Sequence, residues 1–264
     1  MFIDVIIGLS ISLIIAGLAY FKKSLSLSGL IAAVFFGALL YVFGGLIVWI
    51  SLIVFFISSS LLTKLHEKKD KSQDYKGRNY IQVISNALPA TIFSVLFYYN
   101  DNIIFLLGAV VAIAAANADT WASEIGILSK GKTRYIVNLK LAPKGISGGI
   151  TYLGTVASLI GAFVIAVIFM LSYGFIYSFD WIFMTEALLI LTFGGFLGSI
   201  IDSYLGALIQ AKYKGVKTGI LTEKKWLPNE GVILASGLAI ITNDMVNLLS
   251  TFSASVFTVL ILIF

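Results

Sequence analysis

Two carboxylate side chains close a long apolar run near the middle of the chain. Asp119 and Glu124 lie in the stretch 117–126, which follows the apolar run 103–116. A charged side chain at the boundary between hydrocarbon and water is costly unless something pairs with it, so such residues usually mark a functional site. We therefore take these two acids as the first candidates for catalysis.

A third acid lies in a similar setting further along the chain. Asp202 is followed by Ser203 and Tyr204, as Asp119 is followed by Thr120 and a tryptophan, and a Lys-Thr pair comes after each stretch. This pattern predicts a parallel repeat that brings two equivalent acids to one face. Parallel repeats are also common in transporters, so the repeat alone does not indicate an enzyme.

The residue types near these acids favour a hard cation. The chain has one histidine and no cysteine, which disfavours zinc, whereas Mg²⁺ needs only one or two carboxylates together with water and phosphate oxygens. We predict that Asp119 and Asp202 bind Mg²⁺, with Glu124 and Lys144 contributing to catalysis. Phosphoryl transfer requires mainly positioning and charge neutralisation, which acids and lysine-rich loops can supply.

The composition indicates where these residues must lie. The chain of 264 residues is 59% hydrophobic and only 12% charged, against about 25% charged residues in soluble domains. We therefore expect a single integral membrane domain over residues 1–264. The apolar N-terminus carries Asp4 and no basic residue before its apolar run, so we expect a membrane helix there and not a signal peptide.

The apolar runs predict an all-α, polytopic transmembrane bundle of about nine helices. Each run is long enough to cross roughly 30 Å of hydrocarbon. The predicted helices cover 2–20, 27–62 divided in two at Gly44-Gly45, 80–99, 103–118, 150–171, 181–211, and 231–264, with a polar break at 242–247 before a short last helix.

The basic residues predict the orientation of this bundle. All 18 lysines and arginines fall within four segments, 22–23, 64–78, 130–144 and 212–225. Nine helices would put all four segments on one side of the membrane, which the positive-inside rule makes cytoplasmic. We thus expect the N-terminus outside, the C-terminus inside and the acids on the cytoplasmic face. Contact with anionic headgroups is an alternative role for any single lysine.

At the level of motifs, the chain resembles the phytyl-phosphate kinase family of membrane proteins. The most specific part is Asn-Ala-Asp-Thr-Trp-Ala-Ser-Glu-Ile-Gly at 117–126, followed by Lys-Gly-Ile-Ser-Gly-Gly at 144–149. Further matches include the segment around Arg78, Gln82 and Asn86. The pattern of acid, Ala-Ser and glycine at 119–126 is more distantly similar to dolichol and phytol kinases and to CDP-diacylglycerol synthases.

This resemblance implies a Mg²⁺-dependent kinase that transfers phosphate from a nucleoside triphosphate, CTP, to an isoprenyl monophosphate in the bilayer. No nucleic acid partner is expected, and a homodimer is left open. The residues that we assign to substrate and nucleotide binding are polar residues or glycines: Arg78, Gln82, Asn86, Asn117, Ser123, Lys132, Lys140, Gly145, Ser147, Gly148, Ser203, Asn243 and Asn247. For the intramembrane polar residues, hydrogen bonding between helices is the alternative role.

Two other functions remain open from the sequence. The same acids could serve an isoprenoid alcohol kinase or a lipid cytidylyltransferase, and an alcohol acceptor would need Asp119 or Glu124 as a base. A lipid or ion transporter could use paired acids as a cation site, but it would be expected to hold them near the membrane midplane. Here the acids cluster at one side of the predicted membrane.

Overall fold

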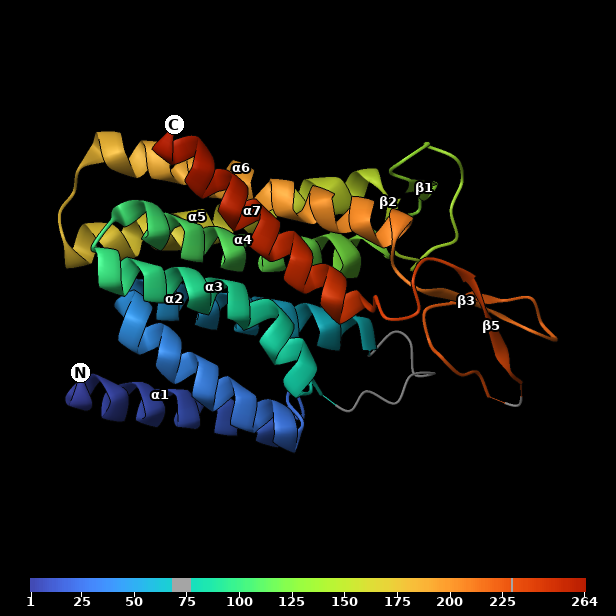
Figure 1. Cartoon of the computed structure of the whole chain (residues 1–264), viewed down its shortest axis with the longest axis horizontal. Coiled ribbons are helices and arrows are strands. Elements are labelled where there is room, and N and C mark those ends of the chain that lie inside the picture. Colours follow the sequence, from blue (N-terminus) through green and yellow to red (C-terminus); the bar gives the residue numbers. More distant parts are fainter. Residues whose placement is uncertain (68–76, 229) are drawn as a thin grey trace.

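The computed structural model describes residues 1–67, 77–228 and 230–264, and within them the chain is a helical bundle (Figure 1). Seven helices are long and apolar enough to cross a membrane. This confirms the all-α, polytopic architecture. The helices are α1 (Phe2–Phe21), α2 (Leu27–Glu67), α3 (Tyr80–Asn100), α4 (Ile103–Gly126), α5 (Tyr152–Ile176), α6 (Trp181–Leu208) and α7 (Asn243–Ile263).

Helix α2 is two antiparallel arms joined at Gly45. Gly45 has φ 70° and ψ −173°, a backbone conformation that is essentially restricted to glycine. Beyond the bend the second arm runs back beside the first. Gly37 and Trp49 lie on either side of the bend in the sequence, and both contact Ser12 of α1. The turn predicted at Gly44-Gly45 is therefore confirmed. With α2 counted twice, the seven helices of the described chain make eight crossings.

The prediction of a membrane helix after Gly231 is wrong. Residues Val232–Ser236 form strand β5, which pairs with β3 (Lys212–Gly215). The polar stretch at 242–247, predicted as a break, is instead the start of α7, with the Thr242 side chain accepting a hydrogen bond from Met245 N–H as its N-cap. Strand pairing satisfies the backbone of this segment outside the bundle, so one predicted crossing is lost.

An even number of crossings changes the predicted position of the C-terminus. Both termini lie toward the end of the bundle opposite the strands (Figure 1). The prediction that they lie on opposite sides of the membrane is therefore wrong. The error follows directly from counting residues 231–241 as a helix, since each added crossing moves the C-terminus to the other face.

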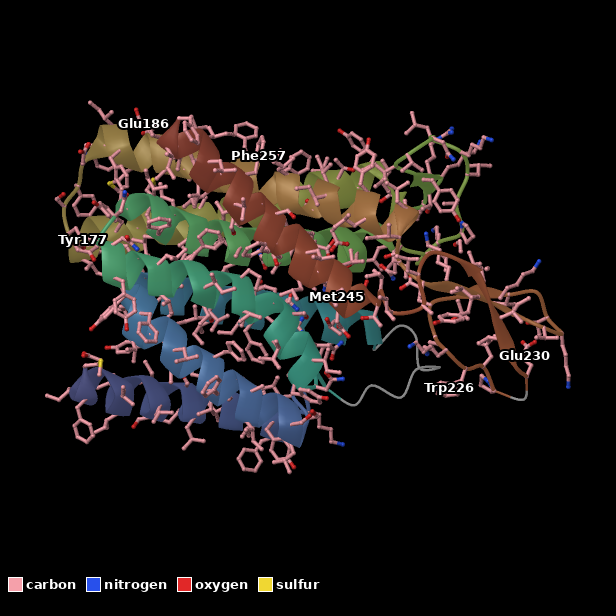
Figure 2. All side chains as sticks on the ribbon, viewed as in Figure 1. Tyr177, Glu186, Trp226, Glu230, Met245 and Phe257 are labelled. Atoms are coloured by element: carbon pink, nitrogen blue, oxygen red, sulfur yellow. The ribbon has the colours of Figure 1, made fainter. Side chains whose placement is uncertain are left out.

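The connections at the other end carry two small antiparallel sheets. Between α4 and α5, β1 (Arg134–Tyr135) pairs with β2 (Gly149–Ile150). Between α6 and α7, β4 (Leu221–Thr222), β3 and β5 form a sheet in the order β4-β3-β5. Figure 2 shows Trp226 and Glu230 at this end and Glu186 and Tyr177 at the opposite one. We call the end of the bundle that carries the two sheets the loop end.

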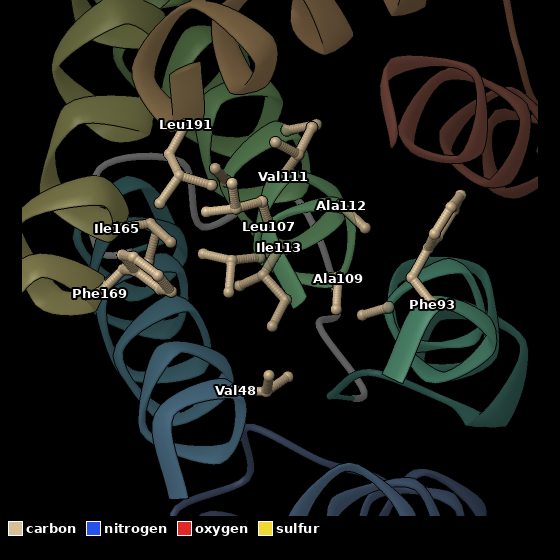
Figure 3. Close-up of a cluster of buried hydrophobic side chains, with 14 of the residues drawn as sticks. Val48, Phe93, Leu107, Ala109, Val111, Ala112, Ile113, Ile165, Phe169 and Leu191 are labelled. Carbon is tan, nitrogen blue, oxygen red and sulfur yellow. The ribbon is translucent and has the colours of Figure 1, made fainter. Parts of the chain in front are cut away.

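Helix α4 is the centre of the structure. Its residues from Leu106 to Ala118 are buried, and they pack against α2, α3, α5, α6 and α7. Figure 3 shows Leu107, Val111 and Ile113 of α4 surrounded by side chains of neighbouring helices, among them Phe93 and Leu191. Many of its residues are alanine, which lets neighbouring backbones come close in a membrane bundle.

Helix α4 is also longer than predicted, and this changes the setting of the acids. It continues to Gly126 and not only to residue 118, so Asp119 and Glu124 lie on its last turns and not in a loop. Helix α6 ends at Leu208, three residues before the predicted boundary. Asp202 therefore lies inside α6, near its end.

The lysines and arginines of the described chain all lie at the loop end, in or beside the connections after α1, α2, α4 and α6. Four lysines of the predicted basic segment 64–78 fall within 68–76, outside the described residues. The charge distribution still predicts that the loop end is cytoplasmic, and both termini are then expected outside.

This orientation can be tested with two matched cysteine variants, because the chain has no cysteine of its own. Ser178 lies exposed in the α5–α6 connection at one end, and Ser236 lies exposed in β5 at the other. A membrane-impermeant maleimide added to intact cells should label Ser178→Cys but label Ser236→Cys only after permeabilisation. The unsubstituted chain should remain unlabelled, and the reverse pattern would contradict a cytoplasmic loop end.

Candidate active site

A polar cavity of about 450 Å³ opens among the helix ends and connections at the loop end. Helices α2 to α7 all contribute side chains to its wall, as does the connection between α4 and α5. The structure brings most of the predicted site residues together here: Arg78, Gln82, Asn86, Asp119, Ser123, Glu124, Lys144, Gly145, Ser147, Gly148, Asp202, Ser203, Asn243 and Asn247 all line it.

The two aspartates meet inside this cavity. The carboxyl groups of Asp119 on α4 and Asp202 on α6 lie close enough to interact directly, and Asp202 is 5% exposed. Two carboxylates this close can both be charged only if a cation lies between them; otherwise they must share a proton. The pair is therefore either a proton-sharing dyad or one half of a cation site.

Close packing of α4 and α6 brings the aspartates together. A Cβ atom added to Gly198 would lie 2.3 Å from Cβ of Ala115. A Cβ atom added to Gly195 would lie 2.7 Å from Cβ of Ala114. Asp202 and Asp119 each come four residues, about one helical turn, after this contact. The sequence pattern of small residues followed by an acid thus sets the distance between the two carboxylates.

Helix α7 holds Asp202 from the other side. Ser250 Oγ donates to Asp202 Oδ2 at 3.0 Å. Asn247 Nδ2, in the amide orientation that satisfies both of its neighbours, donates to the same oxygen at 3.1 Å and to the Asn243 carbonyl at 3.2 Å. Asn247 was predicted to bind substrate, but its contacts in the structure position Asp202. Ser250 and Asn247 both donate to Oδ2 of Asp202, and neither donates to Oδ1.

Glu124 lies one to two turns beyond Asp119 on the cavity wall and contacts the second arm of α2. Thr63 Oγ1 donates to Glu124 Oε1 at 2.7 Å. Arg78, just before α3, lies with its guanidinium 5.7 Å from the ring centre of Phe55. These contacts tie the rim of the cavity to α2.

The glycine-rich segment before α5 is held in place by its neighbours. Ser147 N–H donates to Glu223 Oε1 at 2.6 Å, and Ser147 Oγ donates to Gln210 Oε1 at 2.8 Å. Lys144 Nζ donates to the Ser129 carbonyl. The segment lines the cavity, but the Ser147 N–H already donates to Glu223 and is not available to an anion.

Glu223 is a cavity residue that the sequence did not indicate. It lies just after β4, between Thr222 and two lysines. Burial raises the pKa of Glu223, while the Ser147 N–H and the Lys212 ammonium act in the opposite direction. An acid next to lysines in a polar connection usually indicates a solvated charge, so no signal in the sequence could have distinguished it.

Three predicted binding residues lie away from the cavity. Asn117 is fully buried, where it accepts from Ser58 Oγ at 2.9 Å and donates to the Gly161 carbonyl at 2.7 Å. It therefore links α2, α4 and α5 and has no free group for a ligand. Lys132 and Lys140 are exposed on the α4–α5 connection and do not line the cavity. The structure therefore places these three residues outside the cavity that the other predicted site residues line.

Comparison with known families gives one assignment. The family model for the integral membrane protein DUF92 matches residues 10–255. The chain belongs to the DUF92 family. This match includes all residues that line the cavity and agrees with a multi-pass membrane protein.

Individual relatives extend over most of the DUF92 chain. This chain is 31% identical over 276 residues to Protein PGR of Arabidopsis thaliana, and the match covers 96% of this chain and 94% of Protein PGR. This chain is 36% identical over 195 residues to the uncharacterized membrane protein MJ0933 of Methanocaldococcus jannaschii, covering 72% and 78% respectively. No solved structure matches the chain. The kinase activity implied by the sequence resemblance stays a prediction.

The donor set of this DUF92 site suits Mg²⁺ better than a metal that needs an all-protein cage. In the part of the chain that the structure describes, no three histidine, cysteine or acidic side chains gather as a metal cluster. Mg²⁺ commonly takes one or two carboxylates and completes its shell with water and phosphate oxygens. The Asp119–Asp202 pair, with one oxygen of Asp202 unused by α7, fits that pattern.

Three helices present their N-termini to the cavity. Helices α3, α5 and α7 all begin at the loop end, and residues of their first turns, Gln82, Gly154 and Asn243, line the cavity. Helix N-termini carry partial positive charge and favour anions. Together with Arg78 and Lys144, they make a cavity that combines a pair of carboxylates with an environment for phosphates.

The packing of α4 against α6 generates the first prediction about this site. Gly198→Ala should force the two helices apart, because the new methyl would overlap Ala115, and overpacking of this kind costs about 1–3 kcal/mol. Thermal unfolding in detergent should show a lower midpoint. Gly17→Ala is the matched control, since its Cβ would meet nothing within 4 Å. Equal midpoints for both variants would contradict a tight contact.

The two glutamates of the α6–α7 connection should respond oppositely to pH. Because burial raises the pKa of Glu223, ionisation of this side chain lowers the stability of the folded protein. The loss appears as the pH rises from the pKa of Glu223 in the unfolded chain through its higher pKa in the folded protein. Glu223→Gln should therefore gain stability relative to the parent chain as the pH rises, while its Oε1 still accepts from Ser147. Unfolding midpoints from about pH 4 to about pH 8 would measure this.

The pKa of Glu230 is shifted in the opposite direction from that of Glu223. Hydrogen bonds from the Thr218 side chain, the Thr218 N–H and the Lys217 N–H lower the pKa of Glu230. The ionised Glu230 side chain therefore stabilises the protein above its pKa in the unfolded chain. This stabilisation is lost as the pH falls through its lower pKa in the folded protein. Glu230→Gln should be less stable than the parent near neutrality and approach it in acid. Parallel pH profiles for the two variants would refute both assignments.

Proposed function

We propose that this DUF92 protein is a Mg²⁺-dependent membrane kinase that transfers the γ-phosphoryl group of a nucleoside triphosphate, CTP, to an isoprenyl monophosphate. The observation that carries the proposal is the Asp119–Asp202 pair inside a polar cavity at one end of the membrane helices. The resemblance of the segments around both acids to phytyl-phosphate kinases supplies the substrate class and the nucleotide.

The reaction needs little chemistry from the protein beyond positioning. An oxygen of the prenyl monophosphate attacks the γ-phosphorus of the triphosphate, and the bond from that phosphorus to the β,γ-bridging oxygen breaks. The products are a prenyl diphosphate and a nucleoside diphosphate. The attacking oxygen is already anionic near neutral pH, so no histidine base is required. The main barrier is the repulsion between two anionic reactants, which a preorganised positive site lowers.

The residues of the cavity match these requirements. Asp119 and Asp202 would hold Mg²⁺, which when bound neutralises charge on the triphosphate. Arg78 and Lys144 lie on the wall of the same cavity and would pair with phosphate oxygens. Asn247 and Ser250 keep Asp202 in one orientation. Glu124, held by Thr63, would orient a ligand or a neighbouring basic side chain.

The position of the acids favours an enzyme over a transporter. A transport path would need polar groups leading from the cavity toward the other end of the bundle. The helix α4 residues that precede Asp119, from Leu106 to Ala116, form the buried apolar core. The acids therefore lie at one end of a packed interior, where a lipid head and a soluble nucleotide could meet.

The proposal predicts a specific transfer by the purified protein. Protein in detergent or nanodiscs should move label from a γ-labelled triphosphate to added geranylgeranyl monophosphate in the presence of Mg²⁺. CTP should be the best donor of a panel that includes ATP, GTP and UTP. Labelling of the prenyl alcohol alone would indicate an alcohol kinase, and release of pyrophosphate with transfer of the nucleotide would indicate a cytidylyltransferase. Absence of transfer to every acceptor would refute the enzyme class.

In the same assay, Asp119→Asn and Asp202→Asn should each abolish Mg²⁺-dependent transfer, with a loss of at least about 10²-fold as expected for a major electrostatic contributor. Asp101→Asn is the matched control, because Asp101 is exposed at the turn opposite the cavity and asparagine tolerates its left-handed backbone. All three variants should unfold at similar temperatures. Full activity in either cavity variant would disprove the role of the pair.

A further inference from the structure

A second cavity lies next to the polar one, and its wall is almost entirely apolar. It has a volume of about 70 Å³ and lies between α1, both arms of α2 and α3. Its wall includes Ala16 from α1, Phe36 and Leu52 from the two arms of α2, and Val83 from α3. We call it the apolar groove.

Ser12, one of the polar side chains on the wall of the apolar groove, already has a hydrogen-bond partner. Ser12 of α1 is 4% exposed and accepts a hydrogen bond from Trp49 Nε1 at 3.1 Å. A polar or water-filled cavity would be expected to keep unpaired donors or acceptors on its wall. The groove therefore suits a hydrocarbon occupant.

The apolar groove and the polar cavity adjoin each other and share part of their walls. Phe55, Arg78, Gln82 and Asn86 line both of them. The Arg78 guanidinium lies over the rings of Phe55 and Phe56, at 5.7 Å and 6.0 Å from their centres. A cation and two amides thus stand at the border between a hydrocarbon surface and a site for phosphates.

The backbone keeps this border in place. Arg78 N–H donates to the Ser24 carbonyl, and Ser26 N–H donates to the Arg78 carbonyl, both at 3.0 Å. These bonds join the turn between α1 and α2 to the segment that begins α3. The helices that form the groove are therefore fixed to the residue that marks its polar end.

We propose that the apolar groove holds the first part of the hydrocarbon chain of the acceptor lipid, while its phosphate head passes Arg78, Gln82 and Asn86 into the polar cavity. This inference rests on the proposed function for the lipid phosphate. The groove takes only a short length of chain, and the remainder lies in the bilayer beside α1, which is at the edge of the bundle (Figure 1). The juxtaposition selects a ligand with one anionic head and an apolar chain.

Photolabelling tests the position of the chain without depending on catalysis. The probe is a prenyl monophosphate with a diazirine in its first isoprene units, bound to the full chain in nanodiscs. We expect labelled peptides from α1, α2 and α3 around residues 12–16, 33–37, 52–56 and 83–87, with the label displaced by geranylgeranyl monophosphate. Label that is displaced but lies on other helices would overturn the groove and leave the proposed function intact.

Two further outcomes are informative. Labelling of the groove that geranylgeranyl monophosphate does not displace would mean that ordinary bilayer chains fill it, and would overturn the inference. Absence of any displaceable label would refute the acceptor class, and with it both the proposed function and the groove. Transfer activity measured on the same preparation separates a failed acceptor assignment from inactive protein.

A matched pair of variants gives a second test. Ala33 lies on the groove wall, so Ala33→Leu should fill part of it and raise the concentration of geranylgeranyl monophosphate needed for half displacement by about tenfold. Its KM for CTP should not change. Gly17→Leu adds a side chain to α1 where nothing lies within 4 Å, and it should behave like the parent chain. An unchanged half-displacement concentration in a folded Ala33→Leu protein would overturn the proposal.

Discussion

The close contact between α4 and α6 is the constraint on which the rest of the site depends. Gly198 and Ala115 leave no room for an additional methyl group, and the two aspartates follow one turn later on the same side. Within a membrane, helices gain little from the hydrophobic effect when they associate, so small residues that allow close packing are the main source of attraction. The packing that stabilises the bundle is therefore also what brings two carboxylates into contact.

Bringing two acids together inside a bundle costs free energy that other contacts must offset. Ser250 and Asn247 of α7 both donate to Asp202, which partly replaces the lost hydration of that carboxylate. The remaining repulsion is relieved only by a shared proton or a cation. The packing of α4, α6 and α7 fixes the positions of both acids, and the Mg²⁺ site that we propose would use this arrangement.

The loop end combines three environments within one region. The pair of acids lines the polar cavity together with basic side chains and helix N-termini. An apolar groove adjoins this cavity at Arg78. The prenyl monophosphate that we propose as acceptor would present matching groups, with hydrocarbon next to a phosphate. The second arm of α2 contributes to both compartments, with Phe55 on their common wall and Thr63 bound to Glu124. Its position depends on the bend at Gly45.

The sequence by itself determined the membrane architecture, the turn at Gly45 and the two acids that meet, because hydrophobic run length and the cost of a charge in hydrocarbon are properties of local composition. It could not determine that residues 232–236 pair as a strand, since an apolar run of that length is compatible with either structure. Nor could it separate Asn117, which bonds within the core, from residues that line the cavity. The roles of Asn247 and Glu223 were also decided only by tertiary structure, because each depends on a partner that lies far away in the sequence and is brought close by helix packing.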